Sequence, residues 1–318
     1  MSRSLTLVVD ETQLAPLVES AVAYADEATA SSTRRKYVAA FHAFEVWCVG
    51  KGVPSLPAAP TTVAVYLAAL ADAGKRPNTI SGALAGIAFA HRDARLPWEK
   101  GHPAIKAVIA GIRRRLGVAV VQKTPILDTD LLAMVVDLGV DLSDLRDRAV
   151  LTLGFMGAFR RSELTALDVA DLEARREGYL AHVRRSKTDQ EGEGAFKAIP
   201  YTSEIHVCPV RALRTWLGAS GITEGPVFRA VTQIGGLEGR LEPREVARIV
   251  KRRAIAAGLD PARFAGHSLR AGFVTMAAKK GKTVDAIMRQ TGHKNPTTVA
   301  KYVRLANAFE QSAAVGLM

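Results

Sequence analysis

The chain has 318 residues, of which 48% are hydrophobic and 23% charged, so it is long and apolar enough for two folded domains with sizeable cores. Its formal net charge of +12 indicates a polyanionic partner, either a nucleic acid or an anionic membrane surface, and leaves open a merely basic soluble protein. Because it shows no run of about 18 apolar residues, no secretion signal and only two cysteines, we expect a cytoplasmic protein with no metal cluster, disulfide framework or membrane partner.

Apolar residues at helical intervals predict a wholly helical N-terminal domain over residues 1–117. In a first helix, 10–28, Leu14, Leu17 and Val18 fall on one stripe. Prolines and glycine then divide the chain into four further helices, expected after Ser31, over 61–73, from Pro77 and after Pro103.

Basic residues gather at the ends of these helices. Such clusters are typical of a solvated face, but several on one small domain can also follow a phosphate backbone. The candidate nucleic-acid contacts are Arg34, Arg35, Lys36, Arg113, Arg114 and Arg115.

Residues 118–126 carry no helical period and contain a proline, so we expect them to form a linker to a second domain over 127–318. Helical patterning restarts over 127–140, where Asp128 or Thr129 is the expected N-cap. It then continues over 141–158.

The stretch 160–172 begins with an arginine at the predicted start of a helix, which is a favourable place for an anion. Ser162 is the expected cap, and Glu163 lies in the first turn. An ion pair between Arg160 and Glu163 without any chemical role is the alternative.

A change to alternating apolar residues predicts a β-hairpin over 178–202, with strands 179–183 and 196–199. Lys187 lies at the loop end of the first strand. Such a lysine is usually solvent-facing, but it can also enter a site that forms when a substrate docks and donate a proton to a leaving oxygen.

The predicted helix 242–259 is strongly amphipathic. Its apolar residues Val246, Ile249, Val250 and Ile255 are expected to face mainly inward. The other face presents four cations to a duplex groove or backbone, namely Arg244, Arg248, Lys251 and Arg252.

Two imidazoles, a guanidinium and a phenol are spaced along 267–304, in HSLRAGF, TGH and AKYVR. This set suits phosphoryl transfer to an enzyme hydroxyl, because a phosphodiester transition state needs fixed donors for its oxygens. Arg270 can clamp two such oxygens, and Tyr302 can act as a nucleophile if positive charge favours its phenolate. Taken alone, Tyr302 is equally typical of the apolar side of an amphipathic helix.

Six residues in order complete a known pattern: Arg160 in RRSEL, Lys187 in SKTD, His267 and Arg270 in HSLR, His293 in TGH and Tyr302 in KYVR. On these residues the sequence resembles the tyrosine recombinases of the phage integrase family, closest in character to the Cre-like site-specific recombinases. The resemblance covers nearly the whole chain. It implies a mainly α fold with a small β-hairpin or sheet, in which 1–117 is a core-binding domain and 127–318 a catalytic domain ending in a docking helix.

The resemblance also implies a role for each residue. Tyr302 would attack the scissile phosphate and form a 3′-phosphotyrosyl link, while Arg160, Arg270 and His293 would hold the non-bridging oxygens. Lys187 would protonate the leaving 5′-oxygen, with Lys197 on the return strand as the alternative. His267 would assist proton transfer, and Glu163 would orient its neighbours. No ATP, metal or other cofactor is required.

The implied partner is double-stranded DNA with paired recombination sites, bound by a dimer at each site and a homotetramer in all. Two alternatives stay open. One is a catalytically silent DNA-binding protein of the same fold, and the other is an enzyme like the type IB topoisomerases, which would act on DNA of arbitrary sequence.

Overall fold

The computed structural model describes residues 30–99, 101–117, 123–184 and 194–306, together with residues 14, 17, 20, 24, 313–315 and 317. The chain divides into two compact units, Met1–Val121 and Gln122–Met318. Both are built mainly of helices, and the β-structure is confined to two small sheets in the second unit. The mainly α fold predicted from the sequence is therefore confirmed.

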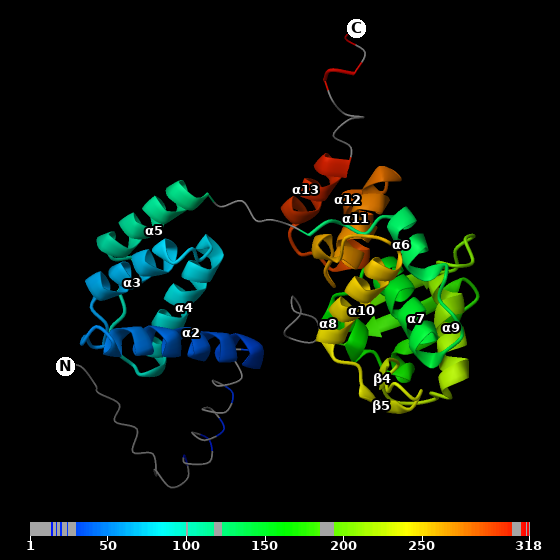
Figure 1. Ribbon diagram of the computed structural model, residues 1–318, viewed down its shortest axis with the longest axis horizontal. Coiled ribbons are helices and arrows are strands. Elements are labelled where there is room, and N and C mark those ends of the chain that lie inside the picture. Colours follow the sequence, from blue (N-terminus) through cyan, green and yellow to red (C-terminus); the bar gives the residue numbers. More distant parts are fainter. Residues whose placement is uncertain are drawn as a thin grey trace, which may run out of the picture. The chain divides into compact units, whose positions relative to one another are not determined.

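In the first unit, the structure defines the bounds of four helices (Figure 1). Three of them begin with proline, whose missing N–H costs nothing in the first turn. At Gly86 a Cβ would lie 2.8 Å from the Cβ of Ala40, so the glycine lets two of these helices pack closely. Buried side chains such as Phe44, Leu67 and Ile87 form the core. The helices are α2 (Ser31–Val49), α3 (Pro60–Asp72), α4 (Pro77–Asp93) and α5 (Pro103–Leu116).

The four helices expected after residue 30 are thus present close to their predicted bounds. The expected first helix, 10–28, lies mostly outside the described residues, as do residues 118–122 of the expected linker.

The second unit is organised around α7 (Leu142–Met156), in which nearly every residue from Leu145 to Phe155 is buried. It packs against α9 and α11, and its C-terminal end leads directly into the short helix α8. The other helices are α6 (Asp128–Val135), α8 (Arg161–Ala166), α9 (Pro209–Ser220), α10 (Pro243–Ala256), α11 (Ser268–Lys279), α12 (Val284–Thr291) and α13 (Pro296–Ala306).

The predicted hairpin is confirmed as the strands β2 (Gly178–Val183) and β3 (Ala195–Pro200), with Tyr179 opposite Ile199. The sequence did not reveal β1 (Leu172–Arg175), which extends this antiparallel sheet, nor the separate pair β4 (Arg229–Val231) and β5 (Leu237–Arg240). These are short strands, for which an alternating pattern has too few residues to stand out.

Several predicted helix ends were wrong. The expected helix 127–140 ends at Val135, and its first turn is capped by Asp130, which accepts the Leu127 N–H at 2.9 Å, rather than by Asp128 or Thr129. Ser162 is not the cap of α8, because the Glu163 carboxylate accepts the N–H of Arg160 at 3.0 Å. A carboxylate three positions inside the helix satisfies the same orphan donor.

Helix α10 is held to α7 by buried charge. The carboxylate of Asp147, which is fully buried, accepts hydrogen bonds from Arg146, Arg252 and Arg253. The inward face of α10 was predicted correctly for Val246, Ile249 and Val250, whereas Ile255 is 62% exposed.

Gly272 in α11 is packed so tightly that an added Cβ has no room, and it provides a test of this packing. A Cβ at this position would lie 1.9 Å from the Ile126 carbonyl oxygen and 2.8 Å from the Phe155 ring. We expect Gly272→Ala to lower the free energy of unfolding by about 1–3 kcal/mol or more, measured by urea denaturation.

The matched control is Gly218→Ala in α9, where an added Cβ meets no atom within 4 Å. Higher helix propensity should leave that variant unchanged or more stable by up to about 1 kcal/mol. Equal stability of the two variants would contradict the packing described for α11.

Candidate active site

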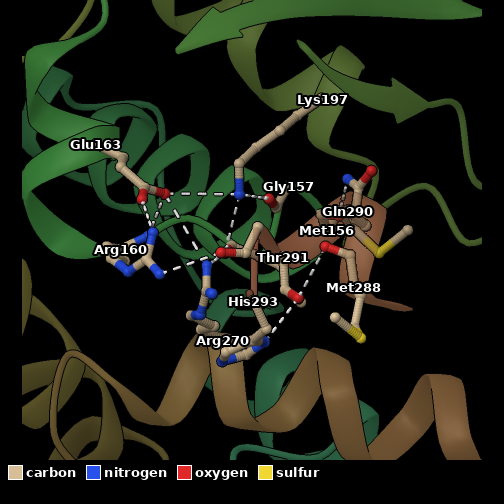
Figure 2. A network of polar contacts seen from close by, with 12 residues as sticks. Met156, Gly157, Arg160, Glu163, Lys197, Arg270, Met288, Gln290, Thr291 and His293 are labelled. Carbon is tan, nitrogen blue, oxygen red and sulfur yellow. Dashed lines mark hydrogen bonds and ion pairs between the residues drawn. The ribbon is translucent and has the colours of Figure 1, made fainter. Parts of the chain in front are cut away.

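A cluster of charged side chains lies where four segments of the second unit meet (Figure 2). Arg160 precedes α8, Glu163 lies within it, Lys197 comes from β3 and Arg270 from α11. The end of α12 contributes Thr291 and His293, and the chain after α7 contributes main-chain carbonyl groups. The carbonyl groups after α7 and the residues of α8 belong to one continuous stretch, and the other three segments are distant from it in sequence and are brought to it by the fold.

Glu163 is the centre of the cluster. Its side chain is 2% exposed, and its carboxylate forms an ion pair with Arg160 Nη1 while also accepting the Arg160 N–H. Lys197 Nζ lies 3.5 Å and Arg270 Nη1 4.0 Å from Glu163 Oε2. Burial alone raises the pKa of the carboxyl group, but the charge of Lys197 and the hydrogen bonds and charge of Arg160 outweigh it, so the pKa is lowered.

Lys197 is a buried cation, only 3% exposed. Its Nζ donates to the carbonyl oxygens of Gly157 at 3.1 Å and Ala158 at 3.3 Å, in addition to the ion pair with Glu163. Burial lowers the pKa of Lys197 to about 8, against the opposing charge of Glu163. An ammonium group has three N–H donors, and these three contacts account for all of them.

Arg270 is 1% exposed, and its Nη1 donates to the Ala158 carbonyl oxygen at 2.8 Å. Its Nε and Nη2 are buried and have no hydrogen-bond partner among the residues that the structure describes. These two N–H groups lie on one edge of the planar guanidinium, which is the fork that binds two oxygens of a carboxylate or phosphate. Burial and the charge of Arg160 lower the pKa of Arg270 to about 10, so it stays charged at neutral pH.

Ala158 has a positive φ of 47°, which is uncommon outside glycine. In this conformation its carbonyl oxygen accepts from both Arg270 and Lys197. The strained residue thus serves the cluster directly, as strained residues at functional sites often do.

The two histidines are neutral in the free protein. Burial, followed by the charges of Arg270 and Arg160, lowers the pKa of the half-buried His293 to about 4. His267, at the N-cap of α11, is an exposed residue, yet partial desolvation and the charges of Arg270, Arg160 and Arg161 also lower its pKa. At neutral pH each ring therefore has one N–H and one lone pair.

Tyr302 lies on α13 and is half-buried against Val274, Ile287 and Val299. Burial raises the pKa of its phenol, and the charge of Arg270 only partly offsets this. Tyr302 therefore lies on an apolar helix face, as one interpretation of the sequence predicted. It also interacts electrostatically with Arg270, as a nucleophile in a cationic site would. In the free protein it is a neutral phenol, not a phenolate.

The structure brings together Arg160, Glu163, Arg270 and His293, with His267 and Tyr302 within electrostatic reach. Lys187 lies outside the described residues. Arg161, the second candidate guanidinium, packs beside Gly266, where a Cβ would lie 2.2 Å from its Cδ.

Sequence reasoning gave no structural role to Lys197 and did not single out Thr291. A signal for Lys197 was present, because β3 alternates and Lys197 shares its inward face with Ile199. No comparable pattern in the sequence indicates a role for Thr291 or for the carbonyl groups of residues 157 and 158.

The basic residues predicted to contact nucleic acid lie on both units. All of them are exposed except Arg34, which is half-buried. On α10, Arg248 and Arg244 lie 2.6 Å and 3.8 Å from the carboxylate of Glu245, and Arg252 donates to Asp147 at 2.7 Å. Part of this cationic face is therefore held in place by intramolecular ion pairs.

Within the described ranges, no group of three or more His, Cys, Asp or Glu side chains is arranged to hold a metal ion. In that same part of the chain, every helix is too short or too polar to cross a membrane.

Fold and site together define a helical protein with a buried cationic cluster, built around one carboxylate and a nearby tyrosine. The model of the phage integrase family matches residues 130–308, and the chain belongs to this family. Site-specific recombination through a phosphotyrosine intermediate is the known activity of that family.

Relatives agree with this assignment. The chain is 39% identical over 295 residues to an integrase/recombinase XerD homolog of Selenomonas ruminantium, covering 91% of this chain and 86% of that protein. It is 28% identical over 196 residues to tyrosine recombinase XerC of Chromohalobacter salexigens, covering 58% of this chain and 59% of that protein.

Solved structures share the fold. The XerH site-specific recombinase bound to a palindromic difH substrate matches with a TM-score of 0.58 at 18% identity, over 82% of this chain and 70% of that one. A lambda integrase dimer bound to a COC′ core site matches with a TM-score of 0.56 at 19% identity, over 86% and 72%.

The stability of the cluster should depend on the negative charge of Glu163. Glu163→Gln removes the negative charge that compensates Arg160, Lys197 and Arg270, and it should lower the free energy of unfolding by about 3 kcal/mol. Chemical denaturation of the full chain at neutral pH measures this change.

Glu173→Gln is the control, because the Glu173 side chain is 55% exposed and pairs only at the surface with Arg175. It should change stability by less than about 0.5 kcal/mol. A Glu163 variant as stable as this control would show that the cluster does not depend on the carboxylate.

Proposed function

We propose that this chain is a site-specific DNA recombinase that cleaves and rejoins DNA strands through a 3′-phosphotyrosyl intermediate on Tyr302, without ATP. Membership of the phage integrase family and the names of its relatives support the reaction class. Double-stranded DNA is the proposed substrate, in keeping with the DNA bound to the structurally similar XerH and lambda integrase.

One observation carries the proposal, namely the unused edge of Arg270. Burying a guanidinium with two unsatisfied N–H groups is costly unless a ligand completes it. Arg160, Lys197 and Arg270 also exceed the single charge of Glu163 by two. A phosphodiester group supplies the oxygens and the negative charge that this cluster lacks.

In the proposed reaction, the Tyr302 hydroxyl attacks the phosphorus, and the bond from phosphorus to the 5′-oxygen breaks. The phenolic proton passes to a neutral histidine, His293 or His267, and the 5′-oxygen takes a proton from a lysine. Arg270 and Arg160 stabilise the charge that develops on the non-bridging oxygens. The tyrosyl phosphodiester replaces one phosphodiester with another, so a 5′-hydroxyl can reverse the step without an energy source.

We assign the general acid to Lys187, as the family motif implies, rather than to Lys197. The ammonium group of Lys197 forms an ion pair with Glu163 and hydrogen bonds to the carbonyl groups of Gly157 and Ala158. If Lys197 gave a proton to a leaving group, it would lose its charge and at least one of these interactions. Lys197 instead holds Glu163 beside the end of α7.

Both units contribute to the proposed DNA surface. Clusters at residues 34–36 and 113–115 make the first unit the candidate core-binding domain, and α10 presents Arg244, Arg248, Lys251 and Arg252 from the second. Contacts of this kind to phosphates release counterions, which makes binding steeply dependent on salt. The proposed place of action is the cytoplasm, where the DNA of a bacterial host lies.

We further propose that a dimer binds each site and that two such dimers form a homotetramer. The C-terminal segment, 307–318, is the proposed link between protomers, although most of it lies outside the described residues. A pocket of about 260 Å³ bordered by Met156, Phe273, Ala277 and Ile287 offers an apolar surface that such a segment could occupy.

Tyr302→Phe tests the nucleophile. The variant lacks only the hydroxyl group, so it should bind DNA as the wild type does and form no covalent adduct. The measurement uses fragmented DNA from the source organism, denaturation, recovery of the covalently attached DNA, and mass spectrometry of the modified peptide.

Adducts of the wild type at Tyr302, on one recurring inverted-repeat sequence, support the recombinase. Adducts at scattered sequences favour a topoisomerase-like enzyme, and binding without adducts favours a silent DNA-binding protein. An adduct that survives in Tyr302→Phe excludes this residue as the nucleophile.

A substrate with sulfur in place of the bridging 5′-oxygen tests the general acid. A thiolate leaves without a proton because the pKa of a thiol is only about 8.5. Lys187→Ala should therefore cleave the oxygen substrate slowly and the sulfur substrate at close to the wild-type rate.

Lys197→Met is the paired variant. If Lys197 only supports Glu163 and Arg270, this substitution should slow the cleavage of both substrates alike. Selective rescue of Lys197→Met by sulfur would move the general acid to Lys197.

A further inference from the structure

Thr291, the last residue of α12, makes a contact to which neither the sequence motif nor the reaction scheme assigns a role. We propose that Thr291 is a positioning residue that fixes which ring nitrogen of His293 carries the proton. The proposal rests on the proposed function for its catalytic consequence, whereas the proton position itself can be measured in the free protein.

Thr291 is fully buried, and its hydroxyl has two close partners. Its Oγ1 lies 2.7 Å from the Ile287 carbonyl oxygen and 2.7 Å from His293 Nδ1. Gly292 lies between Thr291 and His293 and adopts a left-handed conformation, with φ of 67°. This glycine ends the helix and turns the chain so that the imidazole returns to the threonine.

Counting hydrogens assigns the tautomer. Two oxygens 2.7 Å apart need a hydrogen between them, so the single Thr291 hydroxyl hydrogen points to the Ile287 carbonyl. The contact to His293 is equally short and needs a hydrogen of its own, which only the ring can supply. Nδ1 therefore donates to Oγ1, and in a neutral ring Nε2 has the lone pair.

The surroundings keep the ring neutral. Burial is the largest cause that disfavours a second proton on His293, followed by the charges of Arg270 from α11 and Arg160 before α8. His267 and Lys197 on β3 act in the same direction. With one N–H committed to Thr291, the basic nitrogen Nε2 is the one left for chemistry. It can accept the phenolic proton of Tyr302 and, once protonated, donate to a phosphate oxygen.

Thr291 is itself held firmly. The side chain of Gln290 donates to the carbonyl oxygens of Met156 at 3.1 Å and Ala198 at 2.9 Å, which ties the end of α12 to the end of α7 and to β3. Lys197 is the neighbour of Ala198 and binds the same end of α7. These contacts place the Thr291 hydroxyl beside the groups around Glu163, and Figure 2 shows Thr291 next to this network.

The first test reads the tautomer by ¹⁵N correlation spectroscopy of full-length, DNA-free protein labelled at histidine. His293→Gln identifies the resonance by its loss. In the wild type and in Thr291→Ser, which keeps the hydroxyl, Nδ1 should be protonated and Nε2 unprotonated. Thr291→Val is nearly isosteric but has no hydroxyl, and it should lose this preference.

A wild-type ring protonated at Nε2 would overturn the assignment, and so would a folded Thr291→Val that keeps the wild-type tautomer. The wild-type spectrum alone therefore decides the proton position, even if the valine variant folds poorly.

The second test measures adduct formation in a single turnover. Thr291→Val should be slower by about tenfold, the effect of one lost hydrogen bond of about 1.4 kcal/mol, with DNA affinity unchanged. Thr291→Ser should stay within about twofold of the wild type. A valine variant that cleaves at the wild-type rate refutes the positioning role, whereas a wild type that forms no adduct refutes the proposed function and leaves the spectroscopic result intact.

Discussion

The site depends on one carboxylate buried among three cations. Removing a charge from water is expensive, and Glu163 offsets that cost for Arg160, Lys197 and Arg270 only in part. Part of the remainder is offset by the C-terminal end of α7, whose carbonyl groups carry partial negative charge. Gly157 and Ala158 accept from Lys197, and Ala158 also accepts from Arg270. The carbonyl groups at this helix end thus add to the carboxylate of Glu163 in compensating the positive charge of the cluster.

Among the residues that the structure describes, this cluster has more donors and more positive charge than its internal partners satisfy. The unpaired edge of Arg270 and the net charge of two are costs in stability that the oxygens and the single negative charge of a phosphodiester would reduce. Natural proteins commonly accept such costs at sites prepared for a ligand. The neutral histidines and the neutral phenol of Tyr302 fit the same picture, because the cations discourage further positive charge and burial discourages the phenolate.

Much of the fold followed from local pattern. Prolines and apolar stripes located α3, α4 and α5, and alternation located β2 and β3, because these signals lie within a few residues of the element they define. The residues of the candidate site were found by motif spacing. Lys197 was missed as a structural residue because its burial depends on which segments cover β3. Thr291 was missed because His293 comes close to it only where Gly292 turns the chain. The packing of a side chain and the main-chain groups that it can reach depend on the fold of the whole unit. A short window of sequence does not contain this information.

The same end of α7 binds groups that lie 40, 112 and 134 residues further along the chain, in Lys197, Arg270 and Gln290. Contacts so distant in sequence form late, because the intervening chain must first be ordered. A chain that is damaged in any of these segments therefore keeps Tyr302 but lacks the assembled charge cluster. For an enzyme that would break DNA, completion of folding is itself a safeguard against unguided cutting.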